Sequence, residues 1–242
     1  IIVGACLCSD DVVLKNMPTE LNDVKVMISV LRKIGFPIEV EEHNIRIMNS
    51  LRTNIVPNVP IEAKKIRYSL LLLPLLLTHI GKVNNPMPGG CNLGDRKYDI
   101  HLQSLNALGA NVKETKDGIV GTLDEKFKGT DLRFHIATTS GSESAIIAAT
   151  LSEGKTTIRN ANTRPEVIDL INFLNAMGAK ITYSTRYIEI EGVVALNGGE
   201  YSIIDDSHEA VSYMILAGIM RSEIMIRNFN LQFVRQDVTL LR

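Results

Sequence analysis

The stretch Leu174-Asn175-Ala176-Met177-Gly178-Ala179 closes an amphipathic segment with a glycine, and this ending decides how the chain can fold. Close copies of it, Leu105-Asn106-Ala107-Leu108-Gly109-Ala110 and Leu31-Arg32-Lys33-Ile34-Gly35-Phe36, occur at intervals of about 70 residues. The apolar residues before each glycine follow helical spacing, and a glycine just past the last turn commonly ends a helix. The recurrence therefore indicates three copies of one structural unit.

Each copy is expected to follow one plan: a helix of small apolar residues, a short strand, a turn, the amphipathic helix and a two-stranded hairpin. The amphipathic helices are expected at 24–34, 100–108 and 167–177, and the small-apolar helices at 2–8, 68–80 and 144–151. Strands are expected at 12–16, 38–41, 45–48, 111–114, 118–122, 156–160, 180–183 and 187–191. A fourth copy begins with a helix at 209–220, a strand at 224–228 and a second helix at 233–242. Helices packed together with sheets outside would make an α/β fold (α+β repeats) without a doubly wound sheet.

The composition is that of an ordinary globular protein. Of the 242 residues, 45% are hydrophobic and 22% charged, and the formal net charge is −1. This charge, together with aromatic residues at only 5%, gives no support for nucleic-acid binding. The longest apolar run, 69–77, is too short for a bilayer and contains Pro74. Cys6 and Cys8 are too close in sequence for an ordinary disulfide, which favours reduced thiols in a cytosol-like compartment.

A loop is expected at 86–99, which holds two prolines, three glycines, Cys91 and the pair Arg96-Lys97. Proline and glycine disfavour a regular helix or strand, and glycine lets backbone amides approach an anion. Cys91 is either a small packed residue or a thiol whose pKa the neighbouring positive charges lower. Of the three equivalent turns, only this one carries Gly-Gly-Cys together with an arginine, which favours the functional interpretation.

Three further segments each have a functional and a structural interpretation. Arg67 precedes the helix at 68–80. Its guanidinium either makes two hydrogen bonds to a carboxylate or phosphate, or it belongs to a cluster of solvated charges. The segment Thr138-Thr139-Ser140-Gly141-Ser142-Glu143-Ser144 precedes a helix, and it either offers hydroxyls and amides to a phosphate or caps that helix. Asp205 and Asp206 either supply carboxylate chemistry or cap the helix at 209–220, and capping is favoured.

No metal site is expected, because the five histidines are scattered and the three cysteines form no zinc pattern. The sequence also lacks a Gly-Lys-Ser/Thr phosphate loop, a Gly-x-Ser-x-Gly elbow and a Gly-x-Gly-x-x-Gly dinucleotide fingerprint. The loop at 86–99 therefore remains the strongest candidate for chemistry.

The motif Pro88-Gly89-Gly90-Cys91-x-x-Gly94-x-Arg96-x-x-Asp99-x-His101 resembles the cysteine loop of the UDP-N-acetylglucosamine enolpyruvyl transferases (UDP-N-acetylglucosamine 1-carboxyvinyltransferases). Arg67-x-Ser69 upstream agrees with this resemblance, as does Pro165-Glu166-x-x-Asp169-x-x-x-Phe173-Leu174-x-x-x-Gly178-Ala179 downstream. The resemblance covers essentially the full chain. The cysteine loop separates this branch from the sister enzymes that act on shikimate 3-phosphate.

The resemblance implies two domains, each an inside-out α/β barrel of three βαβαββ-type repeats with helices inside and sheets outside. Residues 1–204 would form the first domain without its first strand, and 205–242 the beginning of the second. The implied reaction moves the enolpyruvyl group of phosphoenolpyruvate onto the 3-hydroxyl of UDP-N-acetylglucosamine and releases phosphate. It is the first committed step of peptidoglycan synthesis, in the cytoplasm. The resemblance implies no cofactor, metal, membrane or nucleic acid. The implied partners are the two substrates and the rest of the second domain.

The resemblance also implies roles for particular residues. Cys91 is the catalytic loop cysteine, which assists phosphoenolpyruvate binding and product release and is the target of fosfomycin. Arg67 and Arg96 hold the phosphate and carboxylate of phosphoenolpyruvate. The segments around the uridine diphosphate sugar contain Arg96, Lys97, Tyr98, Asp99, Ile100, Thr138, Thr139 and Ser140.

Departures from the family pattern leave alternatives open. Thr138-Thr139-Ser140 stands where most members have Ser-Val-Gly, and Lys97-Tyr98-Asp99-Ile100 where they have Pro-Val-Asp-Leu. A Lys-Asn pair, a general-base carboxylate and two arginines of the family fall outside the chain, so we expect the chain alone to be inactive. The alternatives are a divergent enolpyruvyl transferase for another uridine nucleotide and a non-catalytic nucleotide-binding paralogue.

Overall fold

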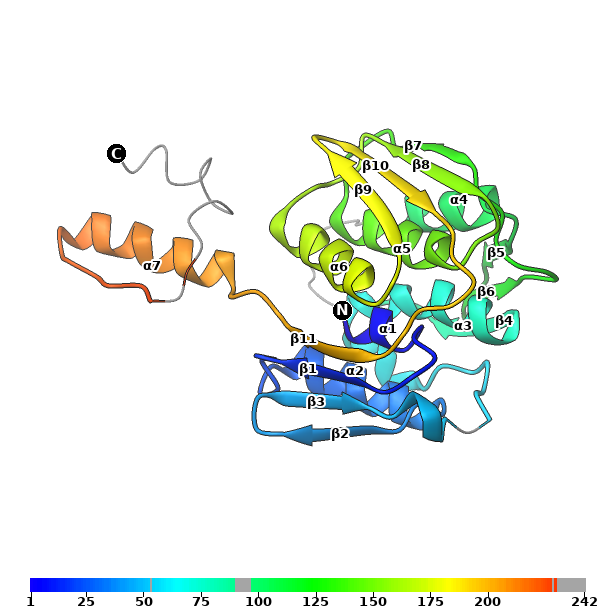
Figure 1. The fold of residues 1–242 in the computed structure, drawn as a ribbon, viewed down its shortest axis with the longest axis horizontal. Helices are drawn as coiled ribbons and strands as arrows, with labels where there is room; N and C mark the ends of the chain where they lie inside the picture. The colour runs from blue at the N-terminus through cyan, green and yellow to red at the C-terminus, as the bar shows by residue number, and fades with distance from the viewer. Residues whose placement is uncertain (53, 90–96, 228, 230–242) are drawn as a thin grey trace. The chain divides into compact units, whose positions relative to one another are not determined.

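The structure is a computed structural model that describes residues 1–52, 54–89, 97–227 and 229 (Figure 1). Two units are distinguished, Ile1–Ser202 and Ile203–Arg242. In the second unit, α7 (Ser207–Met220) begins at Asp206, whose side chain accepts hydrogen bonds from the backbone N–H groups of His208 and Glu209. The capping role expected for Asp206 is therefore confirmed. Among the described helices, none combines the length and apolarity that a bilayer-spanning segment needs.

Three sheets make up the first unit. The strands of the first lie in the order β11 (Gly199–Ser202), β1 (Val12–Lys15), β3 (Asn44–Ile47), β2 (Ile38–Glu41). The second has the order β4 (Lys82–Pro86), β6 (Gly118–Thr122), β5 (Asn111–Glu114). The third has the order β7 (Asp131–Arg133), β8 (Lys155–Arg159), β10 (Tyr187–Glu191), β9 (Lys180–Ser184). Each contains one antiparallel hairpin of the predicted kind, which confirms the three hairpins.

The helices of this unit pack on one another as well as on the sheets. They are α1 (Ile2–Ala5), α2 (Asn22–Lys33), α3 (Leu72–Ile80), α4 (Asp99–Ala107), α5 (Thr139–Thr150) and α6 (Pro165–Ala176), with short 3₁₀ turns at Asn49–Leu51, Ile61–Lys65 and Arg67–Leu71. Helix α5 contacts α3, α4 and α6. All of its residues from Gly141 to Thr150 are buried, including the polar Ser142, Glu143, Ser144 and Thr150.

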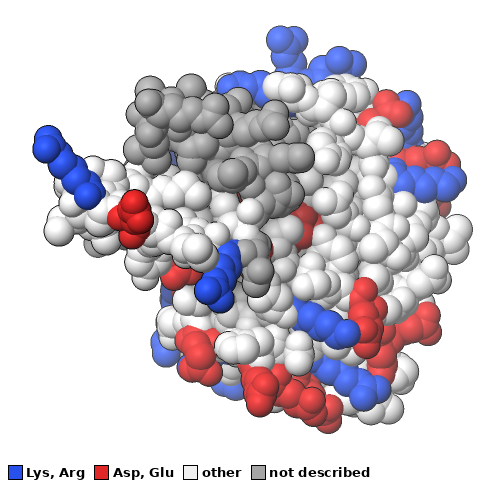
Figure 2. Space-filling model, turned by 60° about the vertical axis from the view of Figure 1, so that its left-hand side comes forward, with Lys and Arg blue, Asp and Glu red and all other residues white. Residues whose placement is uncertain are grey.

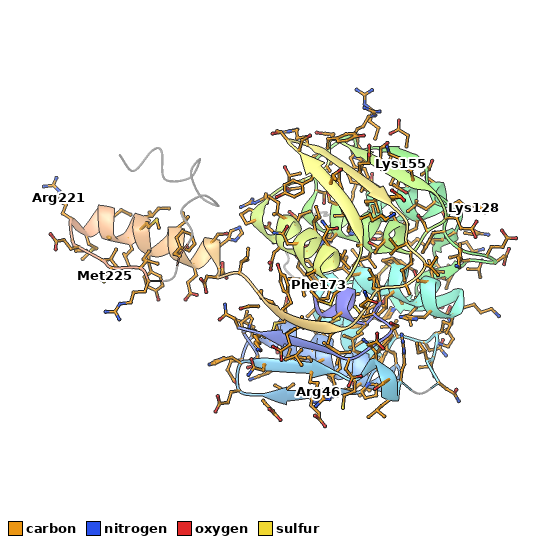
Figure 3. All side chains as sticks on the ribbon, viewed as in Figure 1. Arg46, Lys128, Lys155, Phe173, Arg221 and Met225 are labelled. Atoms are coloured by element: carbon orange, nitrogen blue, oxygen red, sulfur yellow. The ribbon has the colours of Figure 1, made fainter. Side chains whose placement is uncertain are left out.

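Figure 3 shows the contrast between core and surface. Phe173 on α6 is fully buried and meets the ring of Tyr201 edge to face, with 5.4 Å between ring centroids. Lys128, Lys155 and Arg46 extend outward. The face seen in Figure 2 mixes acidic and basic side chains among neutral ones, in keeping with the net charge of −1. Buried apolar side chains, rather than a charged surface, are therefore what holds the elements together.

The repeated helix ending has the same backbone in all three copies. Gly35, Gly109 and Gly178 adopt φ angles of +112°, +105° and +102°. Side chains rarely tolerate this conformation, so the glycine is what lets each helix stop and the next strand begin.

The asparagine of the repeated stretch fixes the corner that follows the helix. Asn175 donates from Nδ2 to the carbonyl of Ile181 at 2.8 Å and accepts from its N–H at 2.9 Å. Asn106 makes the same pair of bonds with Val112, at 3.0 and 2.7 Å. In the first copy Arg32 stands at this place and donates a single bond to the following strand. The side-chain amide thus ties α4 and α6 to the hairpins that follow them.

Several expectations need correction. The small-apolar helix expected at 144–151 begins earlier, at Thr139, and the start of the one expected at 68–80 is a 3₁₀ turn. Pro86 and Asp99, the ends of the expected loop, belong to β4 and α4. The strand expected at 224–228 is wrong in its described part, 224–227, because no described strand pairs with it. The helix expected at 233–242 lies outside the described residues.

Three strands are absent from the expected ones: β4, which lies between the helix at 68–80 and the expected loop, and the parallel-paired β7 and β11. Strand β11 pairs in parallel with β1, with Val12 opposite Gly199, and β7 pairs in parallel with β8. Both are short, and both find their partners far away in the sequence, so local alternation does not reveal them.

The two described cysteines are free, as expected. Cys6 and Cys8 are both buried, and burial raises the pKa of both thiols, that of Cys8 to about 12. They are therefore packed, unreactive groups.

Candidate functional site

Three of the segments that the sequence singles out meet in one region of the first unit. The Nη2 atom of Arg67, at the start of a 3₁₀ turn, donates to the carbonyl of Lys97 at 2.8 Å. A Cβ added at Gly141 would lie 2.9 Å from the Cγ2 atom of Ile100 and closer still to Thr138. Only glycine therefore lets the first turns of α4 and α5 approach this closely. The structure brings together the segments 97–100 and 138–140 beside Arg67.

His101 lies within this junction. Its side chain is almost fully buried, at 2% exposure. Neither ring nitrogen makes a hydrogen bond of ordinary geometry with a described residue. Burial, and to a smaller extent the positive charge of Arg67, lower the pKa of His101 to about 4. The backbone of Tyr98 and Ser140 and the carboxylate of Asp99 act in the opposite direction. The imidazole is therefore neutral at neutral pH and does not compete with Arg67 for an anion.

The segment before α4 is anchored on both sides. Tyr98 donates from its hydroxyl to the sulfur of Met87 at 3.5 Å, and its carbonyl accepts the N–H of His101 at 3.0 Å. Asp99 lies 3.6 Å from the Nε2 atom of His135. These contacts hold the predicted uridine segment against the start of its helix.

The hydroxyl-rich segment forms the first turns of α5 instead of preceding the helix. Thr138 makes no side-chain cap; its carbonyl accepts from the N–H and the hydroxyl of Ser142, at 3.1 and 2.7 Å. Ser142, Glu143 and Ser144 are buried. Only Thr138, Thr139 and Ser140 remain partly exposed, and these are the three residues expected at a diphosphate.

Sequence reasoning missed two residues near this segment. Asn162, in the turn before α6, donates from Nδ2 to the hydroxyl oxygen of Thr139 at 3.0 Å. Glu143 is 8% exposed, and burial, with a smaller effect from Glu166, raises its pKa to about 7. Glu143 stands in the hydroxyl-rich segment that the sequence singles out, but no local pattern indicates that it is buried.

The rest of the predicted site is only partly described. Cys91 and Arg96 lie outside the described residues, so the structure does not place them. On the near side of the loop, Gly89 packs so closely on the carbonyl of Lys64 that a Cβ would overlap it. Within the described ranges, no group of three or more His, Cys, Asp or Glu side chains is arranged to hold a metal ion.

Solved structures with a similar fold include an enolpyruvyl transferase and an EPSP synthase. The enolpyruvyl transferase NikO from Streptomyces tendae matches with a TM-score of 0.73 and 19% identity, over 88% of this chain and 50% of that one. An EPSP synthase from Acinetobacter baumannii matches with a TM-score of 0.71 and 17% identity, over 90% of this chain and 51% of that one. At these identities the likeness concerns the fold alone.

Sequence comparison then gives the family. The family model of EPSP synthase (3-phosphoshikimate 1-carboxyvinyltransferase) matches residues 1–242, and the chain belongs to this family. A UDP-N-acetylglucosamine 1-carboxyvinyltransferase of Coxiella burnetii is 40% identical over 230 residues, which are 94% of this chain and 52% of that protein. One of Wolbachia pipientis subsp. Culex pipiens is 37% identical over 238 residues, 96% of this chain and 56% of that protein. The chain thus spans about half the length of the curated relatives it matches.

Proposed function

We propose that the chain serves the transfer of the enolpyruvyl group from phosphoenolpyruvate to the 3-hydroxyl of UDP-N-acetylglucosamine, in cytoplasmic peptidoglycan synthesis. In this reaction the sugar oxygen becomes bonded to C2 of the enolpyruvyl unit, and the bond from C2 to the phosphate oxygen breaks. The relatives at 35–40% identity carry the name of this activity. The observation that carries the proposal is the meeting of Arg67 with the segments 97–100 and 138–140 at the starts of two packed helices.

The proposed roles follow the chemistry of these groups. Arg67 holds an anionic group of phosphoenolpyruvate, because a guanidinium can form two parallel hydrogen bonds to a carboxylate or phosphate. The free amides at the start of α5, with the hydroxyls of 138–140, hold the diphosphate. Lys97, Tyr98, Asp99 and Ile100 lie along the uridine. Cys91 and Arg96, outside the described residues, are proposed for the phosphoenolpyruvate side.

We further propose that residues 1–204 form one inside-out α/β barrel domain and that 205–242 begin a second. Support comes from the three sheets and from the packing of α5 against α3, α4 and α6. In this proposal the second domain supplies groups that close on the substrates.

Release of phosphate tests the proposal. The 242-residue chain is compared with a protein extended to the full length of the relatives, each given phosphoenolpyruvate and UDP-N-acetylglucosamine. The extended protein should release phosphate only when both substrates are present, and the chain alone should not. An inactive extended protein would contradict the proposed reaction, and robust turnover by the chain alone would contradict the need for the second domain.

A second acceptor is favoured by one observation, the replacement of Pro-Val by Lys97-Tyr98 in the uridine segment. If the acceptor is another uridine nucleotide, calorimetry should show that UMP binds at least as tightly as UDP-N-acetylglucosamine. A clear preference for the sugar nucleotide dismisses this candidate. Covalent labelling of Cys91 by fosfomycin would count against the third possibility, a non-catalytic paralogue.

A further inference from the structure

The side-chain amide of Asn162 has a fixed orientation. Its Oδ1 atom accepts the backbone N–H of Arg164 at 2.9 Å. A backbone N–H can only donate, so the oxygen must face Arg164 and the NH₂ group must face the other way. That group lies 3.0 Å from the hydroxyl oxygen of Thr139. The usual ambiguity between the oxygen and nitrogen of an asparagine is thereby removed.

This orientation decides what the hydroxyl of Thr139 can do. Because Asn162 donates to it, the hydroxyl oxygen is the acceptor and its own hydrogen remains available. No residue in the described part of the chain accepts that hydrogen. Two other hydroxyls on α5 differ: Ser142 and Thr150 each donate, at 2.7 Å, to the carbonyl four residues earlier. Thr139, half-buried at the first position of the helix, has an oriented and unused donor.

The surroundings of this donor suit an anion. The first N–H groups of a helix have no partner within it, so the backbone at 139–141 adds further donors. From α4, the buried His101 lies beside the backbone of Ser140, and neither ring nitrogen makes a hydrogen bond of ordinary geometry with a described residue. Arg67 contributes its positive charge to the same junction. Donors and positive charge therefore converge here, next to an oriented hydroxyl.

We propose that Thr139 is a specificity residue whose hydroxyl donates to a non-bridging oxygen of the diphosphate, and that Asn162 is the positioning residue that aims it. This inference rests on the proposed function. Most members of the resembled family carry valine at the middle of the segment 138–140. Valine has no hydroxyl and cannot donate this hydrogen bond to the diphosphate. The chain thus gains a contact to phosphate that recognises the diphosphate and not the nucleoside.

Calorimetric titration of the 242-residue chain with UDP and with uridine tests the inference. Thr139→Val should weaken UDP binding about tenfold, the size expected for one hydrogen bond to a charged group, and leave uridine binding unchanged. Asn162→Ala should weaken UDP binding about threefold alone, and add nothing once Thr139→Val is present, because both act through one hydroxyl. Thr139→Ser, which keeps the hydroxyl, should retain the affinity.

Thr150→Val is the matched control, since it removes a hydroxyl from the far end of the same helix and should not change UDP affinity. Thermal melting of each variant confirms that it is folded. If Thr139→Val binds UDP as tightly as the wild type, the inference is overturned but the proposed function is not. The same holds if Thr139→Val weakens the binding of UDP and of uridine equally. A wild-type chain that binds no UDP would overturn the proposed nucleotide site, and this inference with it.

Discussion

At the scale of single residues, the partly buried His79 carries a clear electrostatic signature. His79 donates from Nε2 to the carbonyl of Cys6 at 2.9 Å, and Arg52 Nη1 lies 3.3 Å from its Nδ1 atom. Burial, with a smaller effect of Arg52, lowers the pKa of His79 to about 4. The ring is therefore neutral with its proton on Nε2, because a second positive charge beside Arg52 would be unfavourable.

The first prediction follows from this pKa. Since the pKa of His79 is about 4 when folded and near 6.5 when unfolded, its contribution to stability is complete above pH 6.5 and is lost as the pH falls towards 4. The stability of the wild type relative to His79→Gln should fall by about 3 kcal/mol over this range. Urea unfolding of both proteins at several pH values measures the difference.

Comparison with the glutamine variant is needed because Glu143, with its pKa raised to about 7, acts in the opposite direction. Its folded form takes up a proton first, so it gains stability as the pH falls below 7. This effect is common to both proteins and cancels in the difference. A difference that stays constant from pH 7 to pH 4 would show that His79 titrates normally.

The second prediction concerns Gly141. A methyl group there meets Ile100 and Thr138, so Gly141→Ala should lower the free energy of unfolding by about 1–3 kcal/mol. Gly218→Ala is the control, because nothing lies within 4 Å of a Cβ at that position on α7; it should be neutral or slightly stabilising. Urea unfolding measures both, and equal effects would contradict the close approach of α4 and α5.

The sequence indicates some of these residues and conceals others. Arg67 and the segment 138–140 stand out because their types suit anions, and the segment 97–100 stands out through the family resemblance. The contact of Asn162 with α5 and the burial of His101 depend on segments that lie apart in the sequence, which no local pattern encodes. Asn162 is unremarkable in sequence until its bond to Thr139 is seen.

At the scale of elements, the repeated stretch that ends each helix is the strongest organising feature. The third prediction concerns Asn175, which closes the corner between α6 and β9 with two hydrogen bonds. Asn175→Ala should cost about 1–3 kcal/mol of unfolding free energy, because it leaves the N–H and carbonyl of Ile181 without these partners. Asn106→Ala should have a similar effect in the second copy.

Asn172→Ala, at an exposed position one turn earlier on the same helix, is the control. Alanine favours a helix more than asparagine does, so this change should be neutral or slightly stabilising. If the two substitutions on α6 prove equally mild in chemical denaturation, the asparagine corner has no structural importance.

Helices and hairpins with a local signal were predictable. Apolar spacing and the glycines located α2, α4 and α6 within two residues. The start of α5 was placed too late because Thr, Ser and Gly favour loops, and burial against its neighbours overrides that preference. β11 was missed because four residues containing glycine and glutamate carry no alternation, and only pairing with distant β1 makes them a strand.

At the scale of the whole molecule, the mixed α/β fold follows from three copies of one unit. The copies differ where we propose the function to lie: the second carries the cysteine loop, and in the third Asn162 donates to the hydroxyl of Thr139 at the start of the small-apolar helix. Shared architecture with local differences is the usual way a repeated fold acquires one site. The roles proposed for the site residues come only from the family resemblance, since spacing alone left each with a structural alternative.

The most direct test of the account maps where the nucleotide binds on the 242-residue chain. When the chain is titrated with UDP-N-acetylglucosamine and followed by amide NMR, we expect chemical-shift changes concentrated at Tyr98, Ile100, Thr139 and Ser140. The amides of the β2–β3 hairpin should not shift. Shifts confined to other surfaces, or none at saturating nucleotide, would contradict the claim that these two helix starts form the nucleotide site.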